Sequence, residues 1–380
     1  MNKKIPLCVP NLSGNESKYL QNCIKTTFVS SVGEYVNSFE EILKKITGYR
    51  YACAVSSGTA ALHLSLDASG VKHGDLVIVP TYSFIASANA VSHTGATPFF
   101  VDIDEETLNL NLDNLDSILE DKFIVKSEGI FHKKSKKRLS AIMPVFCMGQ
   151  PISFERINRF QKKWKIPMII DAAGAIGCES HNKKIGYIKE GLSIFSFNGN
   201  KTFTCGGGGA FLTNDEKLFK IASHKSKTAR ASDKYIHDMV GYNYRMTNIQ
   251  AALGVAQLER FGDFVSKKIE IFNFYKKNIM LDGIKFIHSK DLKSSRWLSF
   301  FLIQESSSIT SKDIFKKLNE MNIESKHFWV PLHLQPPYKN CLHELDGTAE
   351  KIYKNLIVLP SSTNLTKEDL SYVVETINKL

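Results

Sequence analysis

Hydrophobic and polar positions alternate with two different periods along the first two thirds of the chain. Short apolar runs, rich in residues that favour strands, occur at residues 75–80, 98–101, 139–145, 168–171 and 192–197. Stretches with helical spacing of apolar residues separate them. Strands that alternate with helices in this way predict a mainly parallel sheet covered by helices, and so an α/β fold.

The pattern changes after the capping box at residues 247–250, where a long helix is predicted to lead out of the first domain. Short strands, for example residues 297–303, then alternate with amphipathic helices, and Thr366 is predicted to cap the last one. We therefore expect a large domain over residues 1–258, including an N-terminal arm. A smaller α+β domain is expected over residues 259–380.

Composition supports a globular protein and weakens one alternative. The 380 residues are 43% hydrophobic, which is ample for a large core. A net charge of +11 raises the question of nucleic-acid binding. The densest basic run, residues 132–138, contains no interleaved aromatic residues, so a solvated surface loop is favoured over a polyanion-binding patch. We expect no nucleic-acid partner.

Cysteine usage and the hydropathy of the chain bear on its compartment. No segment reaches membrane-spanning length, and residues 10–16 interrupt any apolar signal-peptide core. Seven cysteines, without a Cys-x-x-Cys pair, argue against a disulfide framework and against a zinc site. We expect a cytoplasmic protein without a membrane partner, with no metal ion, and with reduced and mostly buried thiols.

One lysine, Lys201, lies within a run of small and polar residues that extends over residues 196–209. It follows the predicted strand 192–197, and ligands of open α/β sheets bind beyond the C-terminal ends of strands. A desolvated lysine there is partly neutral and condenses with an aldehyde to a Schiff base. An isolated lysine is more often a solvated loop residue, so this interpretation needs further support.

Two other segments give that support. The apolar run 166–171 ends in Asp171, a buried acid that needs a cationic partner such as a pyridinium nitrogen, although it could instead cap a helix. Residues 53–64 predict a strand, a small-residue turn and a helix whose N-terminus offers N–H groups to an anion. A lysine, an acid and a helix end are the three anchors of pyridoxal phosphate.

The glycine run at residues 206–209 invites a different interpretation, a nucleotide-binding loop. It lacks the spacing of the known phosphate loops, and it precedes a predicted strand, residues 210–213, where those motifs require a helix. Close backbone packing behind Lys201 is the simpler role.

These segments together resemble a known family, the DegT/StrS-type sugar aminotransferases. The matching stretches run through nearly the whole chain in the family's order: residues 57–64, 79–86, 171–173, 196–209, 241–245 and 331–333. The resemblance implies a fold-type I enzyme that depends on pyridoxal phosphate, with a mainly parallel sheet flanked by helices.

The resemblance assigns roles near the ring of the cofactor. Lys201 matches the Schiff-base lysine, which also carries a proton during transamination. Asp171 matches the acid that keeps the pyridine nitrogen protonated. Phe84 matches the aromatic residue that lies against the ring, with plain core packing as the alternative.

Other roles concern the phosphate. Gly58, Thr59 and Ser196 match its cradle, and Asn198 is either their neighbour or a turn residue. Arg245 matches a residue that reaches the phosphate from the neighbouring subunit, which implies a homodimer with shared active sites; a surface salt bridge is the alternative.

Two further residues and one departure concern the substrate side. His333 and Trp329 lie in the segment that returns toward the site in relatives and are candidates for sugar or nucleotide contacts, with core packing an equal alternative for Trp329. Gly174 stands where relatives carry Gln, His or Glu. That leaves one polar contact near the ring open, to be filled by water or by a side chain from elsewhere.

The implied reaction transfers an amino group, from glutamate in relatives, to C4 of a nucleotide-linked 4-keto-6-deoxy sugar. The branch that acts on N-acetylhexosamines for bacillosamine- and legionaminic-type sugars, with UDP favoured over GDP, is resembled by residues 6–16, 29–36, 198–201 and 295–299. A GDP-perosamine synthase is the nearest alternative. A regulatory relative would lack the lysine or the acid, and a sugar dehydratase of the family has histidine in place of Lys201.

Overall fold

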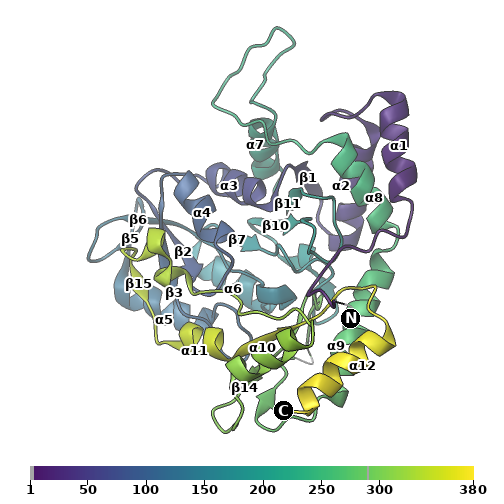
Figure 1. Ribbon diagram of the computed structural model, residues 1–380. Helices are drawn as coiled ribbons and strands as arrows, with labels where there is room; N and C mark the ends of the chain where they lie inside the picture. Colours follow the sequence, from purple (N-terminus) through teal and green to yellow (C-terminus); the bar gives the residue numbers. More distant parts are fainter. Residues whose placement is uncertain (1–3, 289–290) are drawn as a thin grey trace.

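The computed structural model describes residues 4–288 and 291–380, and a central sheet organises most of them (Figure 1). Its first four strands follow the order β1 (Tyr51–Val55), β11 (Gly209–Thr213), β10 (Leu192–Ser196) and β7 (Ile169–Asp171). Parallel bridges between Ile142 and Met168 and between Val145 and Asp171 join β7 to β6 (Arg138–Ile142). The sheet continues through β2 (Leu76–Pro80), β3 (Thr97–Val101) and β15 (His343–Glu344).

Among these strands, β11 alone runs antiparallel to its neighbours. The predicted mainly parallel sheet is therefore confirmed. An antiparallel hairpin, β4 (Phe123–Lys126) and β5 (Gly129–His132), was not predicted and pairs with the beginning of β6. Residues 133–137 of the basic run form the turn between β5 and β6, as expected for a solvated loop. The two ends of the run belong to the strands: His132 is buried at the end of β5, and Arg138 begins β6 and is paired with Asp75.

Helices cover both faces of the sheet because neighbouring residues of each strand point to opposite sides. In β1, Ala52 and Ala54 face one apolar core, whereas Cys53 and Val55 face another. The first core is closed by α2 (Glu34–Thr47), α5 (Leu112–Lys122), α6 (Phe154–Trp164) and α8 (Asn248–Leu258). The second is closed by α3 (Gly58–Ala68), α4 (Ala86–His93) and α7 (Glu216–Ser226).

The helical segment that leads from the central sheet to the C-terminal part differs in one respect from the prediction. The capping box of Thr247 and Gln250 is present and starts α8. The helix ends at Leu258, however, and α9 (Phe261–Asn278) begins after a break at residues 259–260. The expected single long helix is thus two helices.

The C-terminal part has its own antiparallel sheet, β12 (Ile284–Lys285), β14 (Ser299–Ile303) and β16 (Leu356–Leu359). Helices α9, α10 (Ser311–Glu320) and α12 (Lys367–Asn378) pack on it. Thr366 caps α12, as predicted. The N-terminal Ile5 pairs with Ile323 and joins the same core. The domain boundary at residues 258/259 remains a prediction.

The remaining elements are short. They are α1 (Glu16–Thr26), α11 (Thr348–Asn355), β8 (Glu179–Ser180), β9 (Lys183–Lys184), β13 (Leu292–Lys293), and 3-10 turns at Cys147–Gly149, Ile185–Tyr187, Leu332–Leu334 and Pro336–Tyr338. All seven cysteines are free thiols, five of them buried. Within residues 4–288 and 291–380, no helix has both the length and the apolar character needed to cross a membrane.

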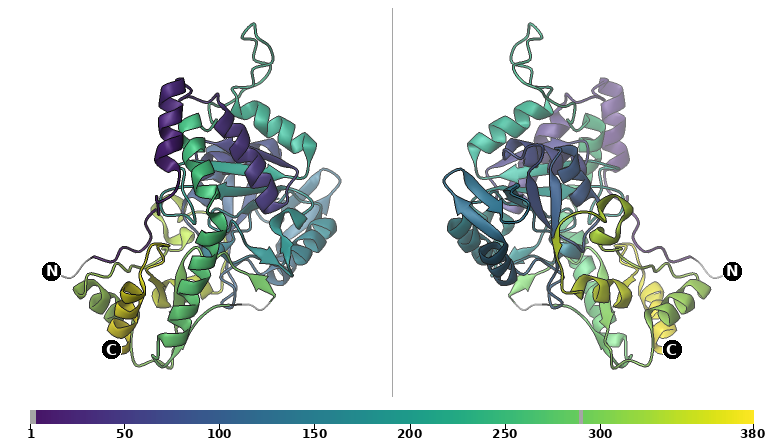
Figure 2. Two further views of the ribbon diagram at one scale, coloured as in Figure 1. Left: turned by 90° about the vertical axis from the view of Figure 1, so that its right-hand side faces the viewer. Right: turned by 90° about the vertical axis from the view of Figure 1, so that its left-hand side faces the viewer.

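A hairpin between α7 and α8 projects from the end of the molecule opposite to α12 (Figures 1 and 2). A bridge between Arg230 and His237 closes it. Its outer end includes Tyr235 and Ile236, which are 74% and 55% exposed. An apolar tip of this kind is unusual on the free surface of a monomer.

Candidate active site

A cavity of about 500 Å³ lies at the C-terminal ends of β7 and β10. The sheet and its loops contribute one side, and the C-terminal part contributes the other through Trp297 and residues 326–329. Of the sites predicted from sequence, the cavity brings together eight: Gly58, Thr59, Phe84, Asp171, Ser196, Asn198, Lys201 and Trp329. Arg245 and His333 are not among its lining residues.

Lys201 follows β10 through a tight turn, in which its N–H donates to the carbonyl of Asn198 at 3.0 Å. Its Nζ lies 3.7 Å from the centre of the Trp297 ring. Burial lowers the pKa of the amine to about 8, although the negative charge of Asp171 acts in the opposite direction. A lysine with this pKa has an appreciable neutral fraction near neutral pH and is a competent nucleophile.

Asp171 ends β7 and is 5% exposed. Ser87 donates its hydroxyl to one carboxylate oxygen at 2.7 Å, and the N–H of Ala173 donates to the other at 3.1 Å. Burial raises the pKa of Asp171 despite these bonds. The segment that follows forms turns, so Asp171 does not cap a helix. A cation beside this carboxylate would hold it ionised.

The other end of the cavity meets the start of α3. The hydroxyl of Ser57 accepts from the N–H of Ala60 at 3.1 Å and caps the helix. Gly58 follows, and a Cβ there would lie 2.9 Å from the Cβ of Ser196, so only glycine lets strand and helix approach this closely. The N–H groups of a first helical turn have no partner within the helix and attract an anion.

Phe84 and Asn198 line the cavity with exposed side chains. Phe84 is 56% exposed, and its ring centre lies 6.3 Å from that of Trp329. It is therefore available to cover a ligand and is not core packing. Asn198 forms the turn before Lys201 through its carbonyl, while its side chain is exposed.

Arg245 lies outside this cavity. Its backbone pairs with Val55, at the end of β1, and its side chain is exposed. In the part of the chain that the structure describes, no ion pair involves Arg245. A surface salt bridge was the alternative role for Arg245. The described part of the subunit does not contain one at this residue.

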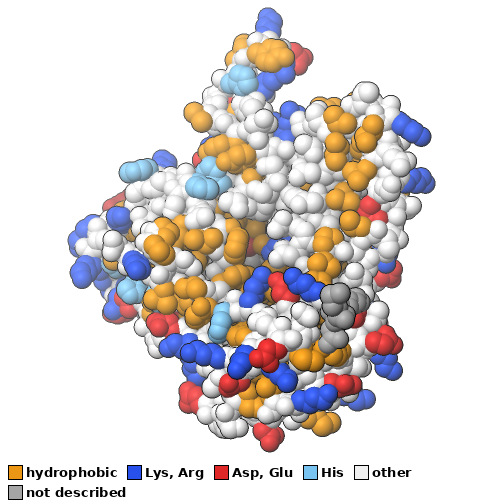
Figure 3. All heavy atoms as spheres, in the orientation of Figure 1, with side chains coloured by type: hydrophobic (Ala, Val, Ile, Leu, Met, Phe, Trp, Pro, Cys, Tyr) orange, Lys and Arg blue, Asp and Glu red, His pale blue; other side chains and the backbone are white. Residues whose placement is uncertain are grey.

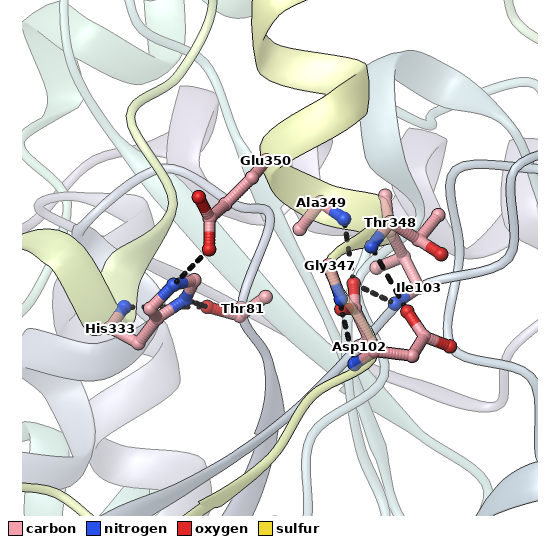
Figure 4. A network of polar contacts seen from close by, with 9 residues as sticks. Thr81, Asp102, Ile103, His333, Gly347, Thr348, Ala349 and Glu350 are labelled. Atoms are coloured by element: carbon pink, nitrogen blue, oxygen red, sulfur yellow. Dashed lines mark hydrogen bonds and ion pairs between the residues drawn. The ribbon is translucent and has the colours of Figure 1, made fainter.

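His333 also has other partners (Figure 4). Its Nδ1 lies 2.7 Å from the hydroxyl of Thr81, and its Nε2 lies 3.4 Å from Glu350. Nearby, Asp102 accepts from the N–H groups of Ala349 and Gly347 at the start of α11, at 2.8 and 2.9 Å. These bonds fasten the return segment to β2 and β3. A contact between His333 and a substrate remains a prediction.

Two contacts were missed by reasoning from the sequence, those of Ser87 and Trp297. Ser87 lies three residues after Phe84 in the first turn of α4, and only its position on the helix could have suggested that it faces Asp171. Trp297 lies within residues 295–299, which resembled a family branch, but no local pattern places its ring beside Lys201.

The chain fits the cofactor predicted for it. A buried carboxylate with a raised pKa, a lysine with a lowered pKa and a helix start closed by Gly58 all border one cavity. These are the complements of a ring nitrogen, an aldehyde and a phosphate.

Comparison with known proteins agrees with this geometry. The model of the DegT/DnrJ/EryC1/StrS aminotransferase family matches residues 10–378. GDP-perosamine synthase from Escherichia coli O157:H7 is 37% identical over 380 residues, covering 99% of this chain and 98% of that protein. UDP-4-amino-4,6-dideoxy-N-acetyl-beta-L-altrosamine transaminase from Campylobacter jejuni serotype O:2 is 32% identical over 375 residues, covering 97% and 95%.

A crystal structure of a DegT DnrJ EryC1 StrS aminotransferase from Brucella abortus superimposes with a TM-score of 0.86 at 26% identity. The match covers 96% of this chain and 95% of that one. The predictions of family and cofactor are confirmed. The chain belongs to the DegT/DnrJ/EryC1/StrS family of aminotransferases, which depend on pyridoxal phosphate.

Proposed function

We propose that the protein transfers an amino group to C4 of a nucleotide-linked 4-keto-6-deoxy sugar, with Lys201 as its catalytic residue. The observation that carries the proposal is the meeting of Lys201 and Asp171 in one cavity, with their pKa values displaced toward each other. Titratable groups whose environments displace their pKa values in this way mark sites of acid and base chemistry.

The residues that would hold pyridoxal phosphate follow from the geometry. Lys201 would bond its aldehyde carbon, Asp171 would pair with its ring nitrogen, and Gly58, Thr59 and Ser196 would surround its phosphate. When bound, the cofactor supplies an electron sink for negative charge on the adjacent carbon.

The side chains of this protein then have separate tasks. The amine of Lys201, once released, accepts a proton at one carbon and delivers it to another, for which a pKa of about 8 is suitable. Ser87 and the N–H of Ala173 orient the carboxylate of Asp171. The exposed ring of Phe84 lies where it would cover a bound ring and exclude water.

For the acceptor we propose an N-acetylated 4-keto-6-deoxyhexosamine, UDP-linked in preference to GDP-linked, with glutamate as the donor. Support comes from residues 6–16, 29–36, 198–201 and 295–299 and from the Campylobacter relative, whose name contains an N-acetylated UDP amino sugar. A GDP sugar with a 2-hydroxyl is the second candidate, because the relative at 37% identity is named a GDP-perosamine synthase.

The test is glutamate-dependent amination of three ketosugars, the UDP- and GDP-linked N-acetyl forms and the GDP-linked 2-hydroxy form. A site built for an acetamido group leaves its polar atoms unpaired with the other sugar, at about 1–3 kcal/mol for each buried group. We expect a higher kcat/KM for an N-acetyl form. A clear preference for the 2-hydroxy sugar would place the protein with the perosamine synthases instead.

We also infer a homodimer with shared active sites. Arg245 is exposed and borders the end of β1, next to the turn that begins α3. Hydrophobic side chains are exposed on the hairpin (Figure 3), where Tyr235 and Val240 are among the exposed residues, and Phe28 and Val32 are exposed elsewhere. Exposed apolar surface, together with a guanidinium that has no ion pair among residues 4–288 and 291–380, suits contact with a second copy of this chain.

The product would be an amino sugar of the bacillosamine or legionaminic type, destined for a surface glycan. A cytoplasmic location remains the prediction from sequence.

A further inference from the structure

Gly174 and Trp297 occupy one space. A Cβ on Gly174 would lie 2.4 Å from Cε3 and 2.9 Å from Cδ2 of Trp297, distances that side chains do not tolerate. The φ angle of Gly174 is not in the positive range. The backbone conformation therefore does not require glycine at position 174. Glycine is required there because the ring of Trp297 leaves no space for a side chain.

Trp297 is held in this place from both ends. Its indole N–H donates to the carbonyl of Asn200 at 2.6 Å, and its own carbonyl accepts from the buried amine of Lys268 at 2.9 Å. Ser295 donates its hydroxyl to the carbonyl of Gly174 at 2.9 Å. Trp297 is 4% exposed as a whole, and its ring has little freedom to move away.

The same ring touches Lys201 in two ways. The carbonyl that accepts from the indole belongs to the peptide bond joining Asn200 to Lys201. The face of the ring lies 3.7 Å from Nζ. An aromatic face attracts an ammonium group, so it favours the protonated amine while burial favours the neutral one.

We propose that Trp297 is a positioning residue for Lys201 and that its ring fills the space that a side chain at position 174 would take. Its ring holds the free amine whenever Lys201 is not bonded to another group, and its N–H fixes the backbone from which the lysine extends. The proposal rests on the proposed role of Lys201 in binding the cofactor.

The first experiment follows the reaction of cofactor-free protein with pyridoxal phosphate by the visible absorption of lysine-bound cofactor, as a function of pH. Trp297→Leu removes the ring face and the N–H, Trp297→Phe restores a face, and Trp164→Leu controls for loss of a tryptophan far from the cavity. We expect Trp297→Leu to slow the reaction about tenfold at pH values above the midpoint, where the amine is neutral in both proteins, with partial recovery in Trp297→Phe. The pH midpoint should move toward acid in Trp297→Leu, because its amine loses a contact that favours the charged form.

A wild-type rate and pH midpoint in Trp297→Leu would overturn the proposal. If instead the wild-type protein does not bind the cofactor through a lysine, both the proposed function and this inference fail. Loss of folding is separated from both by thermal unfolding of each variant.

The second experiment tests the match between the two residues. Gly174→Ala should lower the Tm of the cofactor-free protein, and the same change in a Trp297→Ala background should lower it much less, because the ring it strikes is gone. An equal loss of Tm in both backgrounds would show that Gly174 is not matched to the ring.

Discussion

The hydroxyl of Ser87 lies 2.7 Å from a carboxylate oxygen of Asp171, so a residue in the first turn of α4 orients the acid at the end of β7. Both side chains are buried, at 1% and 5% exposure. A hydrogen bond to a buried charge contributes more than one at the surface.

We expect Ser87→Ala to weaken binding of pyridoxal phosphate by about tenfold or more, since hydrogen bonds to charged groups contribute roughly 1.5–3 kcal/mol. The measurement is a titration of cofactor-free protein. Ser92→Ala is the matched control, because Ser92 lies on the same helix and its hydroxyl donates to Tyr338, whereas that of Ser87 donates to Asp171. Equal affinities of the two variants would contradict the role given to Ser87.

Asp171→Asn should abolish transamination and yet stabilise the cofactor-free protein. Burial raises the pKa of Asp171, so the unfolded chain loses this proton at lower pH than the folded one. The free energy of unfolding therefore falls as pH rises through the interval from the unfolded-state pKa to the folded-state pKa of this carboxyl group. Above the folded-state pKa, the buried ionised carboxylate continues to lower the stability of the folded protein. Asparagine removes this effect. Thermal unfolding between pH 4 and 8 gives the comparison, and a variant less stable than wild type above the interval would contradict this prediction.

The reactivity of Lys201 should depend on pH in a recognisable way. Only the neutral amine condenses with an aldehyde, and burial lowers the pKa of Lys201 to about 8. The rate of cofactor uptake should thus rise with pH and level off just above 8. An ordinary lysine would keep gaining rate to about pH 10.4. Initial rates measured across this range decide between the two curves.

Much of this site could be predicted because its main residues are fixed by local pattern. Asp171 ends one apolar strand and Lys201 follows another, and parallel strands bring their C-terminal ends to one edge. Gly58 is marked by a strand, a turn and a helix start. Such features depend on a few neighbouring residues, and they form in the same way whichever segments pack around them.

The rest depends on contacts between distant segments. Trp297 reaches Gly174 and Lys201 only because the C-terminal part folds back onto the sheet, which no local period encodes. The hairpin of β4 and β5 is short, and the break at residues 259–260 interrupts an otherwise helical stretch. The role of Arg245 requires a second subunit.

The shared-site dimer predicts complementation. Lys201→Ala and Arg245→Ala should each be nearly inactive, since one lacks the amine and the other lacks the guanidinium brought by its partner. Random mixing should restore about a quarter of wild-type activity, because half of the dimers are heterodimers with one intact site of two. Mixed subunits that stay inactive, or an active monomer in sedimentation, would contradict this arrangement.

The central claim is that Lys201 carries the cofactor, and the chain contains a strong competitor. Lys268 is also buried, and burial lowers its pKa as well, but it is committed to the carbonyls of Trp297 and Ser361. Borohydride reduction of the protein loaded with pyridoxal phosphate, followed by mass mapping of its peptides, identifies the bonded lysine directly. We predict the cofactor mass on Lys201 and its loss in Lys201→Ala. Cofactor on Lys268, or on no lysine, would contradict the claim.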